Sequence, residues 1–117
     1  MARLSTHVLD TSRGMPAAGV RVEVHLLEND GRRPVAVATT NADGRTDSPL
    51  VSGESLEVGV YELTFHAGDY FRKAGVALTD PPFLDDVVIR VGIAEPAGSY
   101  HVPLLLAPYG YSSYRGS

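Results

Sequence analysis

Apolar and polar residues alternate along several short stretches of this chain, and the alternation limits the folds available to it. In RVEVHLLE (21–28), the apolar residues Val22, Val24 and Leu26 occupy every second position, and the positions between them are polar. Successive side chains of a strand point to opposite faces, so a period of two is typical of a strand with one buried face. The sequence therefore predicts β-strands rather than amphipathic helices.

Similar stretches recur along the chain, separated by segments rich in glycine, proline, asparagine and aspartate that favour turns. Short strands at this spacing indicate an all-β sandwich and not βαβ units. The exception is AGDYFRKAG (67–75), where Asp69 as N-cap and Gly75 as a stop predict a helix of about two turns. The predicted strands are Leu4–Asp10, Arg21–Glu28, Val35–Thr40, Val60–Ala67, Asp86–Ile93 and His101–Ala107, with Tyr111–Gly116 as a further candidate.

Composition and charge exclude several classes of function. The 117 residues are predicted to form one domain, 1–117, around one hydrophobic core. A net charge of −4 at pH 7 argues against nucleic acid as a partner, and no apolar stretch is long enough to predict a membrane span. The chain has no cysteine, which excludes disulfides and thiol nucleophiles. The first residues lack the apolar core of a signal peptide, so a cytoplasmic location is expected.

The C-terminal stretch YHVPLLLAPYGYSSYRGS (100–117) places polar and aromatic side chains where most chains fray. Pro103 lies inside an otherwise regular strand and cannot donate a hydrogen bond to a neighbour. This predicts either a strand at a sheet edge or one in which the Pro103 nitrogen points away from its neighbour. If 111–116 follows through the APYG turn, it is the outermost strand, and an edge without lysine favours pairing with a second copy.

The four histidines divide into two pairs by the strand faces that they occupy. His25 and His66 are predicted to be ordinary solvent-facing strand residues. His7 and His101 fall opposite the predicted core positions, beside apolar residues such as Leu105, which indicates an interface or a lined cavity. Two histidines can act as general base and proton shuttle. Metal binding is the weaker interpretation because zinc needs three or four protein ligands, and periodicity alone favours a structural role for both.

Three further polar residues have no assigned role from spacing alone. Arg45 follows the NADG turn and Arg115 lies in the terminal YRGS, and both contexts are those of ordinary surface arginines. Ser117 has no neighbouring base in the sequence that would make it a nucleophile.

Motifs along nearly the whole chain resemble those of the transthyretin-like proteins, and within them the 5-hydroxyisourate hydrolases of purine catabolism. The terminal YRGS distinguishes the hydrolases from the hormone-carrying transthyretins, and STHVLD and YHVPLLL occur in the same order and spacing. The matching segments are LSTHVLDT (4–11), GMPAAGVRVEV (14–24), TNADGRTDSPL (40–50), GVYELTFHAGDYF (59–71), PPFLDDVVIRVGI (81–93) and YHVPLLLAPYGYSSYRGS (100–117).

The resemblance implies a transthyretin-like (prealbumin-type) β-sandwich of seven to eight strands with one short helix. It also implies a homotetramer, built as a dimer of dimers around a central channel. The implied reaction opens the six-membered ring of 5-hydroxyisourate, a small-molecule substrate, to 2-oxo-4-hydroxy-4-carboxy-5-ureidoimidazoline on the path from urate to allantoin. Hydrolysis of this ring needs no cofactor. The alternative is a small-molecule carrier that uses the same channel, as transthyretins do for thyroid hormone.

The family's site residues correspond to particular positions of this sequence. The resemblance implies that His7, Arg45, His101 and Ser117 act in catalysis and that Tyr114 helps to bind substrate. Arg115 and Gly116 would support the terminal segment. Ser99 replaces an additional histidine of many relatives, and Ser113 replaces a frequent threonine.

Overall fold

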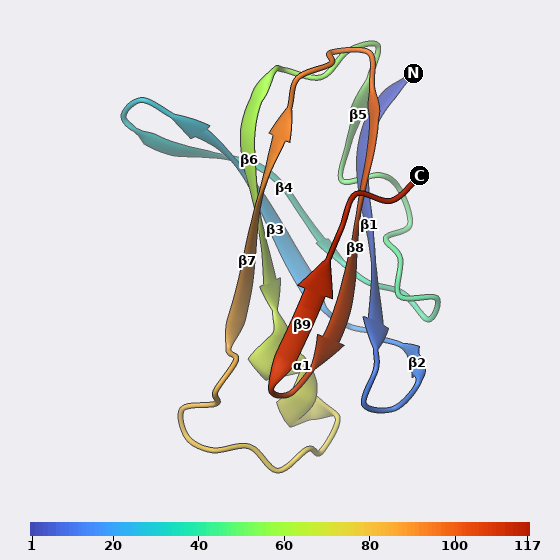
Figure 1. Cartoon of the computed structure of the whole chain (residues 1–117), viewed down its shortest axis with the longest axis vertical. Coiled ribbons are helices and arrows are strands. Elements are labelled where there is room, and N and C mark those ends of the chain that lie inside the picture. The colour runs from blue at the N-terminus through green and yellow to red at the C-terminus, as the bar shows by residue number, and fades with distance from the viewer.

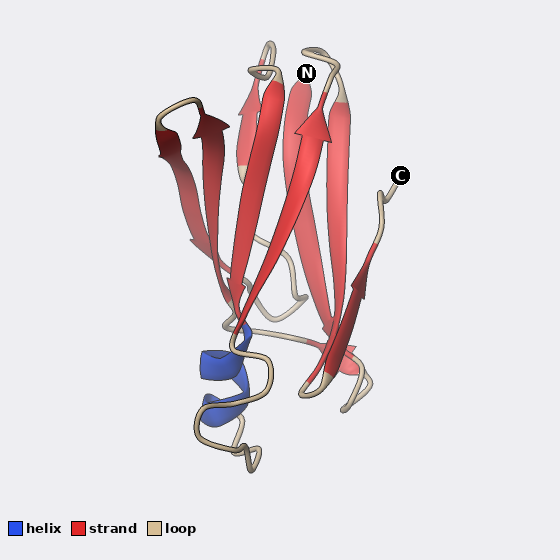
Figure 2. Cartoon of the chain, turned by 60° about the vertical axis from the view of Figure 1, so that its left-hand side comes forward, coloured by secondary structure: helices blue, strands red, loops and turns tan.

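Two β-sheets face each other in the computed structural model, which describes all 117 residues. One sheet has the order β2 (Met15–Pro16), β1 (Ala2–Asp10), β8 (Ser99–Ala107) and β9 (Gly110–Ser113), with β5 (Val51–Gly53) also paired to β1. The other has the order β4 (Gly31–Thr39), β3 (Arg21–Glu28), β6 (Gly59–His66) and β7 (Asp86–Ile93). The single helix, α1 (Ala67–Lys73), lies at one end of the sheets (Figures 1 and 2).

The predicted all-β sandwich is confirmed, and its core follows the alternation of the sequence. Every second side chain of β1, from Ala2 to Asp10, is buried between the sheets, and the intervening ones are half-buried or exposed on the opposite face. β3 repeats the pattern with Val22, Val24 and Leu26 inside. The strands number nine rather than seven or eight because β2 and β5 are short additions along β1. No helix of the structure is long and apolar enough to cross a membrane.

The prediction that Pro103 marks an edge strand is wrong, and its alternative holds only with respect to β1, because the Pro103 nitrogen points away from β1 but toward the β9 side. β8 lies between β1 and β9. The Pro103 carbonyl accepts a hydrogen bond from the Ser113 hydroxyl on the β9 side, and the proline nitrogen of an extended strand lies on the same side. Because that nitrogen has no hydrogen, the ladder with β9 ends at the Leu104–Ser113 pair. Proline is thus accommodated where regular pairing stops.

The last strand is shorter than predicted. β9 does follow the turn after Ala107 as the outermost strand of its sheet, but it ends at Ser113 instead of continuing to Gly116. Beyond it, Gly116 forms one isolated bridge with His101. The terminal segment therefore runs back along β8 without extending the sheet (Figure 1).

The helix is confirmed, but Asp69 is not its N-cap. His66 occupies the N-cap position without a side-chain capping bond, and Asp69 lies in the first helical turn. An acidic residue there still interacts favourably with the helix dipole. Gly75, which follows the C-cap Ala74, has a φ of 79° and ends the helix as predicted.

His66 and His25 are less exposed than the sequence predicts. The His66 ring bridges Asp86, at 3.0 Å from Nδ1, and Glu23, at 2.5 Å from Nε2. Burial alone would lower the pKa of His66, but the two carboxylates outweigh it, so the pKa lies above its ordinary value. His25 is half-buried, and its buried Nδ1 has no hydrogen-bond partner. Both are structural residues of the second sheet.

Candidate active site

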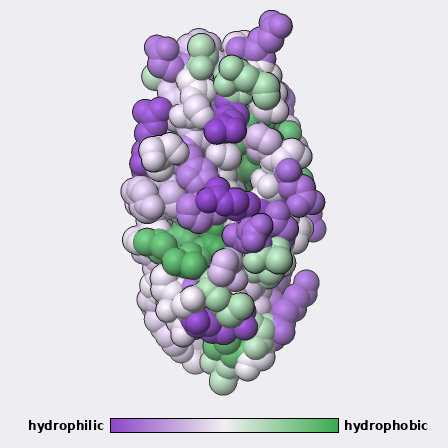
Figure 3. All heavy atoms as spheres, turned by 90° about the vertical axis from the view of Figure 1, so that its right-hand side faces the viewer, coloured by the Kyte–Doolittle hydropathy of each residue, from purple (hydrophilic) through white to green (hydrophobic).

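A pocket of about 430 Å³ lies on the outward face of β1 and β8, away from the core. Fifteen residues line it, and only one of them is hydrophobic. On this side of the molecule, hydrophilic residues gather across the middle of the surface beside a smaller hydrophobic patch (Figure 3). The lining residues are Arg3, Ser5, Thr6, His7, Arg45, Thr46, Asp47, Ser48, Pro49, Ser99, His101, Pro103, Tyr114, Gly116 and Ser117.

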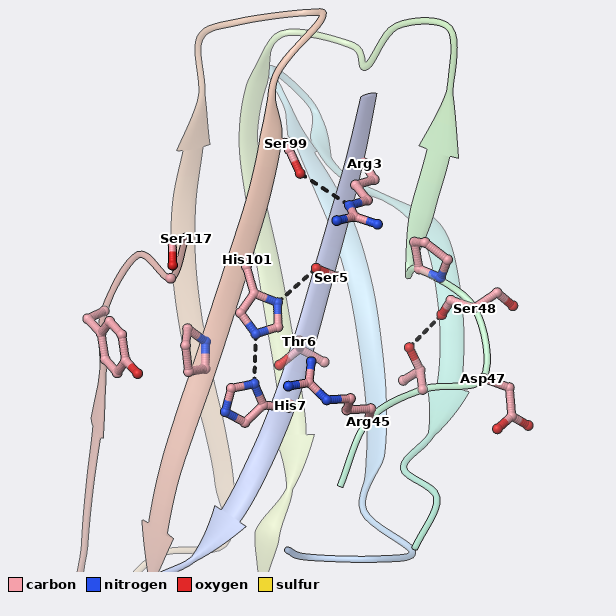
Figure 4. Close-up of a pocket in the computed structure, with 15 residues that line it drawn as sticks. Arg3, Ser5, Thr6, His7, Arg45, Asp47, Ser48, Ser99, His101 and Ser117 are labelled. Carbon is pink, nitrogen blue, oxygen red and sulfur yellow. Dashed lines mark hydrogen bonds between the residues drawn. The ribbon is translucent and has the colours of Figure 1, made fainter. Parts of the chain in front are cut away.

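His7 and His101 meet in this pocket because β1 and β8 run parallel. The register places Ser5 opposite His101 and His7 opposite Pro103, so both imidazoles project from the same face of adjacent strands. Nδ1 of His7 lies 2.7 Å from Nε2 of His101, and the ring centroids are 4.8 Å apart. Figure 4 shows the rings joined by this hydrogen bond. The predicted outward orientation of both histidines is confirmed.

The surroundings of the two histidines favour their neutral forms. Burial lowers the pKa of His7, and the positive charge of Arg45 lowers it further. Burial is also the largest cause of the lowered pKa of His101, followed by the charges of His7, Arg45 and Arg3. An imidazole without its second proton can accept one, so the pair is prepared to act as a base near neutral pH.

The loop 41–45 places Arg45 on the other side of His7. The Asn41 side chain accepts backbone hydrogen bonds from Asp43 and Arg45, which shapes the turn. The Val8 amide then donates to the Gly44 carbonyl at 2.8 Å, and Arg45 bridges to His7 along the free edge of β1. Gly44 has a φ of 73°, and a Cβ there would lie 2.3 Å from the Val8 carbonyl oxygen. Only glycine allows the loop to come this close to Val8 of β1. The close contact directs Arg45 toward the His7 ring (Figure 4).

The C-terminal segment closes the pocket on the β8 side. The Gly116 amide donates to the His101 carbonyl at 2.8 Å, and Tyr114, Gly116 and Ser117 all line the cavity. Arg115 does not line it. Its guanidinium lies 4.3 Å from the centre of the Tyr100 ring and holds the segment against β8.

The position of Gly116 gives a testable prediction. A Cβ at this residue would lie 2.7 Å from Cδ2 of His101, so Gly116→Ala must displace either the segment or the imidazole. We expect kcat for the reaction at this site to fall by about tenfold to about 100-fold, because small misplacements of reacting groups are costly. Gly110→Ala is the matched control, since a Cβ at Gly110 meets nothing within 4 Å. Equal activity of the two variants would contradict the proposed contribution of the segment.

The structure thus brings together six of the seven site residues predicted from the resemblance and places Arg115 beside them. Sequence reasoning missed the other polar residues of the pocket. Ser5 Oγ lies 2.8 Å from Nδ1 of His101, and Arg3 donates from Nε to the Ser99 hydroxyl at 3.2 Å. Arg3 and Ser5 share the outward face of β1 with His7, so the period of two could have identified them. Residues 46–49 lie outside any strand, so no periodicity could have identified them as pocket residues.

No group of three or more histidine, aspartate or glutamate side chains is arranged to hold a metal ion. What the arrangement offers chemically is a neutral imidazole pair, a planar cation next to it and hydroxyl groups around a small polar cavity. These groups can activate water, stabilise a developing negative charge and orient a polar ring.

Known proteins resemble this chain over nearly its whole length. The sequence pattern of the HIUase/Transthyretin family matches residues 4–116. The chain is 57% identical over 115 residues to 5-hydroxyisourate hydrolase 2 of Rhizobium meliloti, covering 98% of this chain and 96% of that protein.

Two solved structures share the fold. The structure of Klebsiella pneumoniae 5-hydroxyisourate hydrolase superposes with a TM-score of 0.82 at 38% identity, and the match covers 100% of both chains. The crystal structure of (S)-allantoin synthase gives a TM-score of 0.91 at 42% identity, and the match covers 99% of this chain but 44% of that one. By sequence and by structure, the chain belongs to the HIUase/Transthyretin family.

Proposed function

We propose that this chain is a 5-hydroxyisourate hydrolase, which opens the six-membered ring of its substrate to 2-oxo-4-hydroxy-4-carboxy-5-ureidoimidazoline during the degradation of urate to allantoin. The observation that carries the proposal is the hydrogen-bonded pair of His7 and His101, with Arg45 beside it, in a polar pocket. The near full-length relatives that bear this enzyme's name support it.

The chemistry of the ring sets what the site has to do. Water attacks the acyl carbon, forming a carbon–oxygen bond, and the bond from that carbon to the ring nitrogen breaks. The histidine pair takes one proton from the attacking water and returns it to the departing nitrogen. The second water proton leaves when the new carboxyl group ionises. Protons and electrons therefore balance without a further reactant.

The remaining residues of the pocket have complementary roles in the proposal. The Arg45 guanidinium binds the carbonyl edge of the ring through its fork of N–H donors and stabilises the negative charge that develops on oxygen. Tyr114 and Ser117 close the pocket over the substrate, and the Ser117 hydroxyl or terminal carboxylate contacts substrate or water. Gly116 allows the segment to approach His101, and Arg115 anchors it on Tyr100.

The lowered pKa values predict the pH dependence of the reaction. The catalytic pair must be neutral to accept a proton, and the pKa of each histidine lies below the ordinary value. The decline of activity on the acid side should therefore have its midpoint below about 6.5, the ordinary histidine pKa. The measurement is kcat/KM across acid and neutral pH, with the spontaneous decay of substrate subtracted at each point. If the decline at low pH, the acid limb of the profile, has its midpoint at or above about 6.5, then burial and the charge of Arg45 do not keep the histidine pair neutral.

A hormone carrier is the alternative with the same fold, and the lining of the pocket disfavours it. An apolar ligand binds best in a cavity with a mostly apolar wall. Here the wall contains two histidines, two arginines, an aspartate and several hydroxyl groups, with one hydrophobic residue among 15.

We further propose that the enzyme is a homotetramer, a dimer of dimers with these pockets at the interface, and that it is cytoplasmic. Half-buried Leu9 and Leu105 share the outward face with the histidines, and β9 leaves a free sheet edge. A second copy that covered both would remove this apolar surface from water. Light scattering on the purified protein should give four times the 12.5 kDa chain mass. A monomer would disprove the assembly.

The direct test of the activity follows the decay of 5-hydroxyisourate by absorbance after urate oxidase has generated it. With this protein present, decay should be far faster than the spontaneous reaction. His25→Asn is a control for substitution effects, because His25 lies on the second sheet outside the pocket. No acceleration by a correctly assembled protein would disprove the hydrolase and favour a binding role for the pocket.

A further inference from the structure

Ser5 is one end of a row of three hydrogen-bonded side chains that line the pocket. Its Oγ lies 2.8 Å from Nδ1 of His101, whose Nε2 lies 2.7 Å from Nδ1 of His7. Figure 4 shows the row, with the His101 ring between Ser5 and the His7 ring below it. The register of the parallel strands creates this geometry, because Ser5 is the residue of β1 directly opposite His101. Nε2 of His7 has no partner within the chain, so it is the atom of the row that can meet a ligand.

The row has two possible proton arrangements, because each neutral imidazole carries one proton. In the first, the Ser5 hydroxyl donates to Nδ1 of His101, Nε2–H of His101 donates to His7, and the His7 proton lies on Nε2. His7 then presents a donor to the pocket. In the second, Nδ1–H of His7 donates to His101, Nδ1–H of His101 donates to Ser5 Oγ, and Nε2 of His7 is bare. Only the second arrangement makes His7 a base.

We infer that Ser5 is a positioning residue that holds His101, and through it His7, in the second arrangement, because both hydrogen bonds fit it and only this arrangement leaves a proton acceptor at Nε2 of His7. Nε2 of His7 is then the general base, and His101 orients it and shares the positive charge after proton transfer. This assignment rests on the proposed hydrolase function and goes beyond it by dividing the roles of the two histidines. A serine suits the position because its oxygen can accept from the neutral pair and from the protonated one alike.

Removing the Ser5 hydroxyl should change catalysis through the imidazoles and not through substrate binding. In Ser5→Ala, Nδ1 of His101 loses its only partner, and the two proton arrangements then compete. We expect kcat to fall by about tenfold to about 100-fold, by analogy with the loss when a partner that orients a metal-ligating histidine is removed. KM should change by less than about threefold, because the Ser5 hydroxyl is already hydrogen-bonded to His101 and is not needed to bind substrate. Ser5→Thr, which keeps the hydroxyl on a strand, should restore most of kcat.

The matched control is Ser52→Ala. Ser52 lies in β5 on the other side of β1, opposite Arg3, and it is exposed and does not line the pocket. Its variant should retain wild-type kcat. If Ser5→Ala also retains it while remaining folded by circular dichroism, the positioning role is disproved.

Nitrogen NMR of the wild-type protein with ¹⁵N-labelled histidine tests the assignment without any substitution. At a pH where both rings are neutral, we expect His7 and His101 to be protonated on Nδ1. Finding the His7 proton on Nε2 would overturn the inference, even if the enzyme is active. Conversely, if the wild-type protein fails to accelerate 5-hydroxyisourate decay, the proposed function falls, and the spectra still decide which arrangement the row adopts.

Discussion

Replacing His7 by asparagine should lower kcat for 5-hydroxyisourate hydrolysis by about 100-fold to about 10⁴-fold, the range that a general base contributes. Asparagine keeps a polar side chain of similar size on the outward face of β1, but it cannot accept a proton from water at neutral pH. The hydrogen bond of 2.7 Å to His101 is lost with the imidazole. Absorbance assays, by stopped flow or at steady state, measure this loss on 5-hydroxyisourate that urate oxidase generates in the same solution.

The same substitution at His101 separates the roles of the two residues. His101→Asn removes the orienting partner but leaves the Nε2 atom of His7 in the pocket, so its loss of kcat should be smaller, at least about tenfold. His25→Asn should leave activity unchanged, because His25 lies in the second sheet. A larger loss for His101 than for His7 would reverse the assignment of the base, and near-normal turnover of both would remove the pair from the mechanism.

Replacing Arg45 by glutamine should lower kcat/KM by about 100-fold to about 1,000-fold, the effect of removing one donor that stabilises a developing oxyanion. It should also move the acid limb of the pH profile upward. Arg45 lowers the pKa of both histidines, so without its charge each pKa rises toward its ordinary value. The neutral base is then lost at a higher pH than in the wild-type enzyme.

Arg45→Lys distinguishes the two effects of this residue. Lysine keeps the positive charge, so the acid limb should remain near its wild-type position, but it lacks the planar fork that binds a carbonyl edge, and kcat/KM should stay low. Arg21→Gln serves as the control, because Arg21 is exposed on β3, far from the pocket lining. An acid limb that is identical in the wild-type and glutamine enzymes would show that the charge of Arg45 does not act on the histidines.

Much of this fold can be predicted from short-range sequence patterns. The alternation of apolar residues identified the long strands within a few residues, since a strand with one buried face needs a period of two whatever it pairs with. The same period placed His7 and His101 on the outward face. The end of α1 was also predictable, because Gly75 adopts a left-handed conformation that other residues avoid.

The errors arose where a neighbour from elsewhere in the chain decides the outcome. Pro103 cannot extend the ladder with β9, but the residues near position 103 do not specify that β9 will lie on that side of β8. Asp69 is a good capping residue in isolation, yet the helix begins earlier, directly after β6. His66 resembles a surface residue until β3 and β7 bring Glu23 and Asp86 to its ring.

For the site, the sequence by itself determined which side chains face outward, which segments turn, and the family to which the motifs belong. Only the tertiary structure decided which outward side chains meet. His101 reaches His7 because β1 pairs in parallel with β8, more than 90 residues away in the chain, and Arg45 and Ser5 approach the pair from two other directions. The physical reason is that period and propensity are local properties, whereas strand pairing is selected by the burial of the whole core.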